Sequence, residues 1–370
     1  MRIAWFRASP PDVANPLDDT AALVDALRST HAVDVVLERD AHDFVWREAR
    51  HPSNLCVYEL DSTAACRFEW GYLRNYAGVV LLRNTDARDT SAAPSGVDGR
   101  LDEYMSAFQV DRLAAGVASL RVPLLASRSV VVQSAELGRS LQSRYPEARV
   151  RCAPLGVRSV VPPAREPRRN EGPLVVGTLG TERRDLVERA VERVRATGHA
   201  IDLRTDGMAA DIVATSDVIV VVSWPPQDVS LAAVVAGMAA GKPVITNEME
   251  ATAEWPALDP QTWKPRGQIE GRAPIAVTVE PLDDEHSVVR ALTRLASDAR
   301  LREQLGRAAH AWWLANATPA LAATAWHHIL EEASALSPPR KPADWPRHLA
   351  ADGMEMTRAV LDEHGLDTDI

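Results

Sequence analysis

The stretch of sequence that decides the fold runs from residue 211 to residue 247 and reads DIVATSDVIVVVSWPPQDVSLAAVVAGMAAGKPVITN. Residues 217–223 are a short run of mostly β-branched side chains between polar neighbours, which predicts a strand covered on both faces. Residues 224–227 contain two prolines, and because proline lacks a backbone N–H the strand must end there. A helix of small apolar residues follows at about 231–240, and a second strand begins at residue 244. The stretch therefore predicts a strand–helix–strand unit of a parallel α/β sheet.

The helix in this unit begins at a loop that follows the carboxyl end of a parallel strand. Asp228 or Ser230 would cap its start, and Gly241 ends it. The free N–H groups of such a helix start bind anionic ligands in many α/β proteins. Every doubly wound sheet has several such turns, so an ordinary unit without a ligand stays an open alternative.

Two segments of the stretch resemble a known family. Residues 216–218 (Ser-Asp-Val) and 236–245 (AGMAAGKPVI) are similar to the donor-site segment of the retaining family-4 glycosyltransferases, which have the GT-B fold. In that family an acidic residue contacts the donor sugar, and the N-terminus of the following helix receives the diphosphate. The resemblance places Asp228 in the role of that acid, whereas Ala236 stands where the family has a second Glu. The helix start that would receive the diphosphate comprises Val229, Ser230 and Leu231.

The turn after the strand expected at residues 174–180 is a second donor-side candidate. The family has an Arg at the end of this strand and a Lys shortly after it, and both hold the donor diphosphate. Here Thr178 stands for the Arg, Gly180 lies in the turn, and Arg183 together with Arg184 stands for the Lys. Arg binds phosphate at least as well as Lys does. The alternative is a pair of solvated charges at a helix start, although basic residues there oppose the helix dipole.

The first half of the chain carries a second resemblance to the same family. Tyr58 and residues 78–80 (Gly-Val-Val) match motifs that lie on the acceptor side. The family's Gly-Asn pair, first His and His-Asp pair are replaced here by Asp61 and Ser62, by Cys66, and by Arg83 and Asn84. Each replacement removes a group that could orient a hydroxyl or take its proton.

A reshaped acceptor pocket is the functional interpretation of these replacements, and its candidate residues are Arg7, Asp61, Arg83 and Asn84. The alternative is that such side chains sit at strand ends and face solvent. We expect that outcome for Glu59. For Arg83 both interpretations stay open, because a cation at a strand end in a cleft often meets an anionic ligand.

Residues 162–173 (PPAREPRRNEGP) are the clearest domain boundary, because they combine proline and charge with almost nothing apolar to bury. We expect an N-terminal Rossmann-like acceptor domain over residues 1–161 and a C-terminal Rossmann-like donor domain over residues 174–335. Residues 336–370 would form a linker and a last helix, which in GT-B proteins can cross back onto the N-terminal domain. Family members also have a further strand and helix, part of the nucleotide-base pocket, where residues 206–211 lead directly into the central stretch.

Three further expectations concern the other helices. Residues 122–126 are interpreted as a connection, and residues 284–296, 300–315 and 319–334 predict helices. The tryptophans expected to pack between these helices are Trp312, Trp313 and Trp326.

Composition narrows the class of protein. A length of 370 residues suffices for two domains with separate cores, and a net charge of −10 argues against nucleic-acid binding. Three widely spaced cysteines form no CxxC pattern, so a disulfide framework and a zinc site are both disfavoured. No apolar run is long enough to cross a bilayer, and the first residues lead directly into a strand instead of a signal peptide. We therefore expect a cytoplasmic protein.

Together these patterns predict an α/β protein of GT-B architecture, with two Rossmann-like domains whose parallel sheets face an interdomain cleft. The resemblance implies a retaining, hexosyltransferase-like enzyme that moves a sugar from a nucleotide-diphosphate donor to an unidentified glycan, lipid or small-molecule acceptor. It implies no cofactor and no metal. A rival hypothesis is a catalytically degenerate GT-B protein that acts as a binding or scaffold partner of another protein. An NAD-dependent oxidoreductase is disfavoured, because no GxGxxG follows the first strand of either domain.

The two leading hypotheses differ in what the donor side should look like. A glycosyltransferase predicts basic side chains that converge at residues 178–184 and open space beside Asp228. A scaffold predicts a cleft filled by side chains such as Trp224, or an apolar surface patch that engages another chain.

Overall fold

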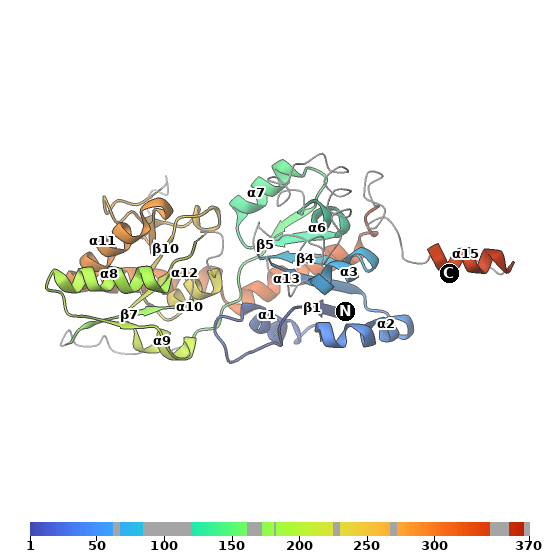
Figure 1. The fold of residues 1–370 in the computed structure, drawn as a ribbon, viewed down its shortest axis with the longest axis horizontal. Coiled ribbons are helices and arrows are strands. Elements are labelled where there is room, and N and C mark those ends of the chain that lie inside the picture. Colours follow the sequence, from blue (N-terminus) through green and yellow to red (C-terminus); the bar gives the residue numbers. More distant parts are fainter. Residues whose placement is uncertain are drawn as a thin grey trace.

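The computed structural model describes residues 1–61, 67–83, 120–160, 172–180, 183–224, 230–266, 272–340 and 355–365. Within these residues the chain forms two separate six-stranded sheets, each covered by helices (Figure 1). Neighbouring strands are parallel in both sheets, as expected for strands that alternate with helices. The boundary expected at residues 162–173 lies almost wholly outside the described residues.

The N-terminal sheet has the strand order β2-β1-β3-β4-β5-β6. Its strands are β1 (Arg2–Phe6), β2 (Ala32–Val36), β3 (Leu55–Leu60), β4 (Val79–Leu82), β5 (Ser129–Val132) and β6 (Val150–Cys152). The helices of this half are α1 (Asp19–Leu27), α2 (Ala41–Arg50), α3 (Arg67–Asn75), α6 (Arg121–Ala126) and α7 (Ala135–Arg144). The central strands β3, β4 and β5 are almost fully buried, as their apolar runs predict.

Helix α6 corrects the expectation that residues 122–126 are only a connection. The segment contains Pro123, and proline interrupts a helix interior. Here it lies in the first turn, where its missing N–H breaks no helical hydrogen bond. Leu124 is buried against the N-terminal core and fixes the helix there.

The C-terminal sheet has the strand order β11-β12-β10-β9-β7-β8. Its strands are β7 (Leu174–Thr178), β8 (Ile201–Arg204), β9 (Val218–Val221), β10 (Val244–Asn247), β11 (Ala257–Leu258) and β12 (Ala276–Val279). Its helices are α8 (Arg184–Ala196), α9 (Ala209–Thr215), α10 (Leu231–Ala239), α11 (Asp284–Ser297) and α12 (Ala299–Asn316). Side chains of α8 and α11 share one core cluster, and those of α10 and α12 share another, so the two pairs cover opposite faces.

Helix α10 lies very close to the sheet, as its small residues predict. A Cβ atom built on Gly237 would be 2.9 Å from Val244 Cγ2 and 3.3 Å from Ile219 Cβ. Only a glycine allows this approach, so the β9–α10–β10 unit depends on the residue type at this position.

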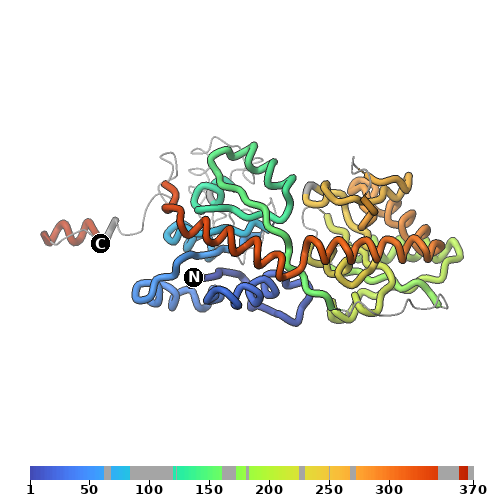
Figure 2. The backbone as a smooth tube through the Cα atoms, turned by 180° about the vertical axis from the view of Figure 1, so that it is seen from behind, coloured from blue at the N-terminus to red at the C-terminus, as the bar shows by residue number. Residues whose placement is uncertain are grey.

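Helix α13 (Pro319–Ala335) leaves the C-terminal half and runs along the N-terminal sheet (Figure 2). It packs on α1, and Trp326 is buried in the same cluster as Trp5 and Val57. The expected division at residue 335 stays a prediction, but this helix packs on the N-terminal half well before that residue. Figure 1 draws the last helix, α15 (Glu355–Glu363), apart from both sheets.

The chain segments that join the two halves are bonded to each other. The backbone N–H of Val157 donates to the carbonyl of Ala317 over 3.0 Å. The indole Nε1 of Trp313 donates to the carbonyl of Val157 over 2.9 Å. Trp313 and Trp326 therefore pack as expected, and Trp312 packs on Trp255 with 5.3 Å between ring centroids.

Candidate functional site

The carboxyl-terminal edge of the C-terminal sheet carries the donor-side candidates. Thr178 ends β7 and is buried, and Gly180 adopts a φ of 105°, which side-chain-bearing residues rarely adopt. Arg183 is the N-cap of α8 and does not cap it through its side chain. Since β7 and β9 are neighbours in a parallel sheet, this turn and the start of α10 lie at the same edge.

Arg183 is bound to an acidic partner. Its Nη2 lies 2.7 Å from Oδ2 of Asp284, the first residue of α11. Both side chains are largely shielded from solvent, at 27% and 14% exposed. The Nε of Arg183 is buried without a hydrogen-bond partner. The ion pair holds the guanidinium at the sheet edge but leaves one of its donors unused.

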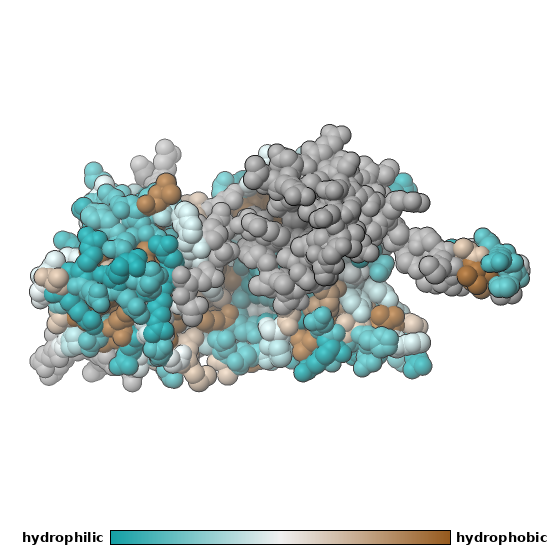
Figure 3. Space-filling model, viewed as in Figure 1, coloured by the Kyte–Doolittle hydropathy of each residue, from teal (hydrophilic) through white to brown (hydrophobic). Residues whose placement is uncertain are grey.

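Arg184 turns away from Arg183. Its guanidinium pairs with Asp206, beyond the end of β8, at 2.9 Å and with Glu188 at 3.0 Å. In Figure 3 the face that carries α8 is dominated by hydrophilic side chains. The two arginines therefore do not converge on one point, and only Arg183 lies between the starts of α8 and α11.

The start of α10 is capped by Ser230, whose hydroxyl accepts a hydrogen bond from the N–H of Ala233 at 3.2 Å. This resolves the alternative between Asp228 and Ser230. Leu231, the first helical residue, is half-buried. Asp228 and Val229 lie outside the described residues, so the role expected for each stays a prediction. Ala236, which takes the place of the family's second Glu, is fully buried in the core.

One residue at the same edge, Asn247, escaped the sequence analysis. Asn247 ends β10 and is fully buried, and its Oδ1 accepts a hydrogen bond from the N–H of Ser223 at 2.8 Å. Its Nδ2 is buried without a hydrogen-bond partner. Trp224, three residues after the end of β9 and named above as a side chain that could fill the cleft, is 50% exposed. The only signal for Asn247 in the sequence is an amide at the end of an apolar strand.

The corresponding edge of the N-terminal sheet holds a buried charge network. Arg7, after β1, pairs with Asp18 at 3.0 Å, and its Nε lies 3.6 Å from Glu59. Arg83, after β4, pairs with Asp19 at 2.8 Å and with Glu59 at 2.6 Å. Two arginines from different strands thus share one carboxylate of β3.

Glu59 corrects the expectation that this side chain faces solvent. Its side chain is 14% exposed, and Oε1 also accepts a hydrogen bond from the Thr20 hydroxyl at 2.8 Å. Sequence reasoning missed the acidic start of α1 as well, although Asp18, Asp19 and Thr20 form an Asp-Asp-Thr cap sequence. Asp18 and Asp19 supply two of the three carboxylates of the network.

Two carboxylates of the network, Asp19 and Glu59, balance the positive charge of Arg83. Burial opposes its charged form, but Asp19 and Glu59 outweigh burial and raise the pKa of the Arg83 guanidinium. Arg83 therefore does not simply face solvent, and the anionic groups that it meets are two carboxylates of the protein itself. Asp61 lies half-buried after β3, and Asn84 lies outside the described residues.

Tyr58, which carries part of the family resemblance, lies in the core. Its ring is fully buried and stacks on Phe6 with 4.8 Å between centroids. Its hydroxyl donates to the carbonyl of Tyr76 at 2.7 Å. Burial raises the pKa of this phenol well above its usual range, so Tyr58 serves packing and not proton transfer.

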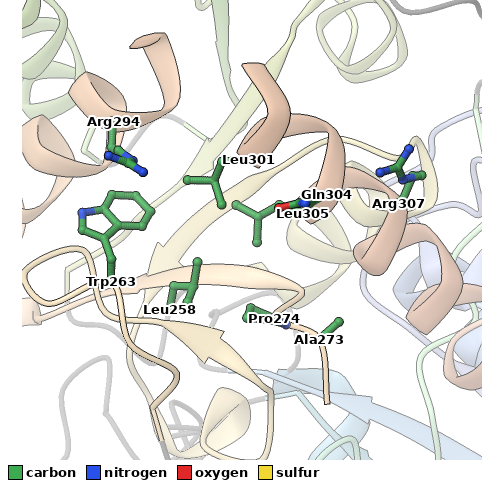
Figure 4. Close-up of a pocket in the computed structure, with 9 residues that line it drawn as sticks. All are labelled: Leu258, Trp263, Ala273, Pro274, Arg294, Leu301, Gln304, Leu305 and Arg307. Carbon is green, nitrogen blue, oxygen red and sulfur yellow. The ribbon is translucent and has the colours of Figure 1, made fainter. Parts of the chain in front are cut away.

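A hollow of about 470 Å³ opens elsewhere, beside β11 (Figure 4). Leu258, Leu301 and Leu305 form its apolar part. The guanidinium of Arg294 lies over the indole of Trp263, 6.0 Å from its centroid. None of the predicted site residues lines this hollow, so it is separate from the two sheet edges.

The described residues contain neither a candidate metal site nor a membrane-spanning helix. No group of three or more His, Cys, Asp or Glu side chains among them is arranged to hold a metal ion. Of the helices within the same residues, none has the length and apolar character to span a membrane.

Comparisons with known proteins place the fold. No family model and no curated protein sequence matches this chain. A glycosyltransferase from Rickettsia africae ESF-5 superposes with a TM-score of 0.52 at 12% identity, over 91% of this chain and 99% of that one. Anabaena Alr3699/HepE, solved with UDP and glucose, gives 0.52 at 12% identity, over 91% and 100%. WaaG, a glycosyltransferase involved in lipopolysaccharide biosynthesis, gives 0.53 at 12% identity, over 88% and 99%.

The chain has the GT-B fold. The predicted fold class is thereby confirmed, with the likeness spanning both sheets. At 12% identity the likeness concerns the fold alone, and the residues at the two sheet edges must carry any argument about function.

Proposed function

We propose that this GT-B protein transfers a sugar, with retention, from a nucleotide-diphosphate donor to an acceptor, and that the donor binds at the carboxyl-terminal edge of the C-terminal sheet. The observation that carries the proposal is the position of Arg183 after β7, at the same edge as the start of α10. A neighbour with this fold, Anabaena Alr3699/HepE, was solved with UDP-glucose.

The chemistry needs a partner for the charge that develops on the leaving diphosphate. The N–H groups at the start of α10 and the guanidinium of Arg183 supply positive potential at fixed positions. Asp228 would contact the hydroxyls of the donor sugar. No step in this scheme uses a metal ion or a cofactor, and the acceptor would be a glycan, a lipid or a small molecule.

A second candidate function is a catalytically degenerate GT-B protein that binds a partner protein. The buried network around Glu59 favours it, because the charges at the acceptor-side edge already satisfy one another. The buried position of Ala236 points the same way, since it offers no side chain to a ligand.

Thermal unfolding with a panel of nucleotides and nucleotide sugars separates the two functions, because a ligand that binds the folded state raises Tm by mass action. The matched variants are Arg183→Ala and Arg184→Ala, which remove the same charge from adjacent residues. A shift with one nucleotide that R183A abolishes and R184A keeps supports the donor site. Release of free sugar from that donor, or transfer to added acceptors, then tests catalysis. No shift with any nucleotide at millimolar concentration favours the binding function.

A further inference from the structure

We propose that Asp284 sets the ligand selectivity of the donor site, by holding on Arg183 the position that a donor phosphate takes. The inference rests on the proposed donor site and names the residue with which the donor must compete. Asp284 has no counterpart in the motifs that relate this chain to the glycosyltransferases, and its contacts alone point to this role.

The carboxylate of Asp284 is bonded at both oxygens. Oδ2 contacts Nη2 of Arg183 at 2.7 Å, and Oδ1 accepts a hydrogen bond from the N–H of Glu285 at 2.7 Å. An acidic group at the start of α11 is also favoured by the helix dipole. The pair is therefore a stable resting arrangement in which Asp284 offsets part of the positive potential of Arg183.

The Asp284 carboxylate does not satisfy all the N–H donors of the Arg183 guanidinium. Arg183 makes a single hydrogen bond to Asp284, and its Nε stays buried without one. Guanidinium groups bind planar or tetrahedral oxyanions through two parallel N–H donors where geometry permits. A phosphate brings more acceptor oxygens than Asp284 does, so it can satisfy donors that the resting pair leaves unpaired.

Further unpaired donors lie on the same face of the sheet. Ile245 of β10 shares a core cluster with Val187 of α8 and Val288 of α11, so Asn247, two residues later, faces the same side. The Nδ2 of Asn247 and the Oγ of Ser287 are buried and have no hydrogen-bond partner. Helices α8 and α11 pack side by side over this face, in the arrangement of Figure 1.

These observations point to a ligand of one chemical class. The helix starts at this sheet edge, Arg183, and the unpaired donors of Asn247 and Ser287 together favour an oxyanion with several oxygens, as in a diphosphate. A ligand with a single weak charge cannot displace Asp284, because it accepts hydrogen bonds from Arg183 no better than the Asp284 carboxylate does. Asp284 thus selects for diphosphates and against chloride, carboxylates and neutral sugars.

The test compares Asp284→Asn with Asp283→Asn. Both remove one negative charge from neighbouring residues, but Asp283 is exposed, and the ion pair of Arg183 is with Asp284. Isothermal titration uses inorganic pyrophosphate and the nucleoside diphosphates ADP, GDP and UDP, and Tm reports folding. We expect D284N to bind pyrophosphate about tenfold tighter than wild type, D283N to stay within about twofold, and R183A combined with D284N to lose the gain.

The outcomes separate this inference from the proposed function. A gain in pyrophosphate affinity in D284N, without binding of any nucleotide, supports the role of Asp284 and removes the nucleotide-donor proposal. Equal nucleotide affinity in wild type and D284N supports the donor proposal and overturns the role of Asp284. Equal gains in D283N and D284N, or no pyrophosphate binding by folded D284N, also overturn it. Should D284N not fold, Asp284→Ser keeps an oxygen for the N–H of Glu285 and decides the question in the same way.

Discussion

The indole ring of Trp326 lies against that of Trp5, with 5.1 Å between the ring centroids. Trp5 belongs to β1 and Trp326 to α13, near opposite ends of the chain, and both are almost completely buried. The contact makes the last long helix a part of the N-terminal core. The stability of that half therefore depends on a segment that follows the C-terminal sheet in the sequence.

Replacing Trp326 by Ala should lower the free energy of unfolding by about 3–5 kcal/mol, the usual cost of removing a fully buried indole. Urea unfolding followed by circular dichroism measures the loss. Leu321→Ala, on the exposed side of the same helix, is the control and should cost much less. Equal losses in the two variants would mean that α13 does not pack on the N-terminal sheet in solution.

Glu59→Gln should destabilise the protein by about 3 kcal/mol, because it leaves two shielded arginines with one carboxylate fewer. Glu136→Gln removes a carboxylate from an exposed pair with Arg139 and should cost much less. Chemical unfolding of both variants at the same pH makes the comparison. A cost for E59Q no larger than that for E136Q would show that the network is solvated.

Gly237→Ala should cost about 1–3 kcal/mol, since the added methyl meets Val244 Cγ2 at 2.9 Å between α10 and the sheet. Gly71, in the interior of α3, has no atom within 4 Å of an added Cβ. Gly71→Ala should therefore stabilise the protein by about 0.5–1 kcal/mol through helix propensity. Opposite signs in the two unfolding curves are the expected result, and a neutral Gly237→Ala contradicts the close packing.

Lowering the pH below about 6.5 should reduce the free energy of unfolding, because His31 takes up a proton less readily in the folded protein than in the unfolded chain. Burial, followed by the positive charges of the N-terminal amine and His327, lowers the pKa of this imidazole, and Glu331 acts in the opposite sense. The unfolded chain takes up the proton near pH 6.5, whereas the folded protein takes it up only at lower pH. The contribution of His31 to the free energy of unfolding is therefore fully present above about pH 6.5. It is lost as the pH falls from there through the lowered pKa of His31 in the folded protein.

His31→Gln should flatten this part of the stability curve, as measured by urea unfolding between about pH 7.5 and about pH 5. The Nε2 of His31 lies 3.0 Å from Nδ1 of His327, so a neutral amide keeps a hydrogen-bonding group there. His328→Gln, on the exposed side of α13, should leave the slope as it is in the wild type. An unchanged slope in H31Q assigns the acid sensitivity to other groups.

The sequence was sufficient for the fold because its decisive unit is local. The β-branched run, the proline pair and the small-residue helix within residues 211–247 lie in sequence order, and β9, α10 and β10 follow that order. Helix α6 has only six residues and contains Pro123, which is tolerated because it lies in the first turn, so its local pattern predicts no helix. Periodicity also predicted the helix over residues 319–334, but an apolar stripe does not tell which sheet it will cover.

The site was predictable only in part, for the same reason. The position of Arg183 after a strand was readable from the chain, and its partner Asp284 was not, because the two residues meet only through the packing of α8 on α11. From the sequence, Glu59 is only a charged residue at the end of a strand. Its partners Arg7 and Arg83 come beside it only in the folded protein. Long-range charge pairing of this kind carries no local signature.

The bonded pair of segments at Val157 and Ala317 has a mechanical consequence. The polypeptide passes between the two halves once near each of these residues, and the two passages are tied together by hydrogen bonds from Val157 and Trp313. Because the two passages are bonded to each other, neither can shift without the other or without breaking these hydrogen bonds. A second contact between the halves joins Arg139 of α7 to Glu254 at 3.1 Å, in an exposed pair that contributes little to stability. The contact between the halves therefore combines buried hydrogen bonds at Val157 with an exposed, weak ion pair at Arg139 and Glu254.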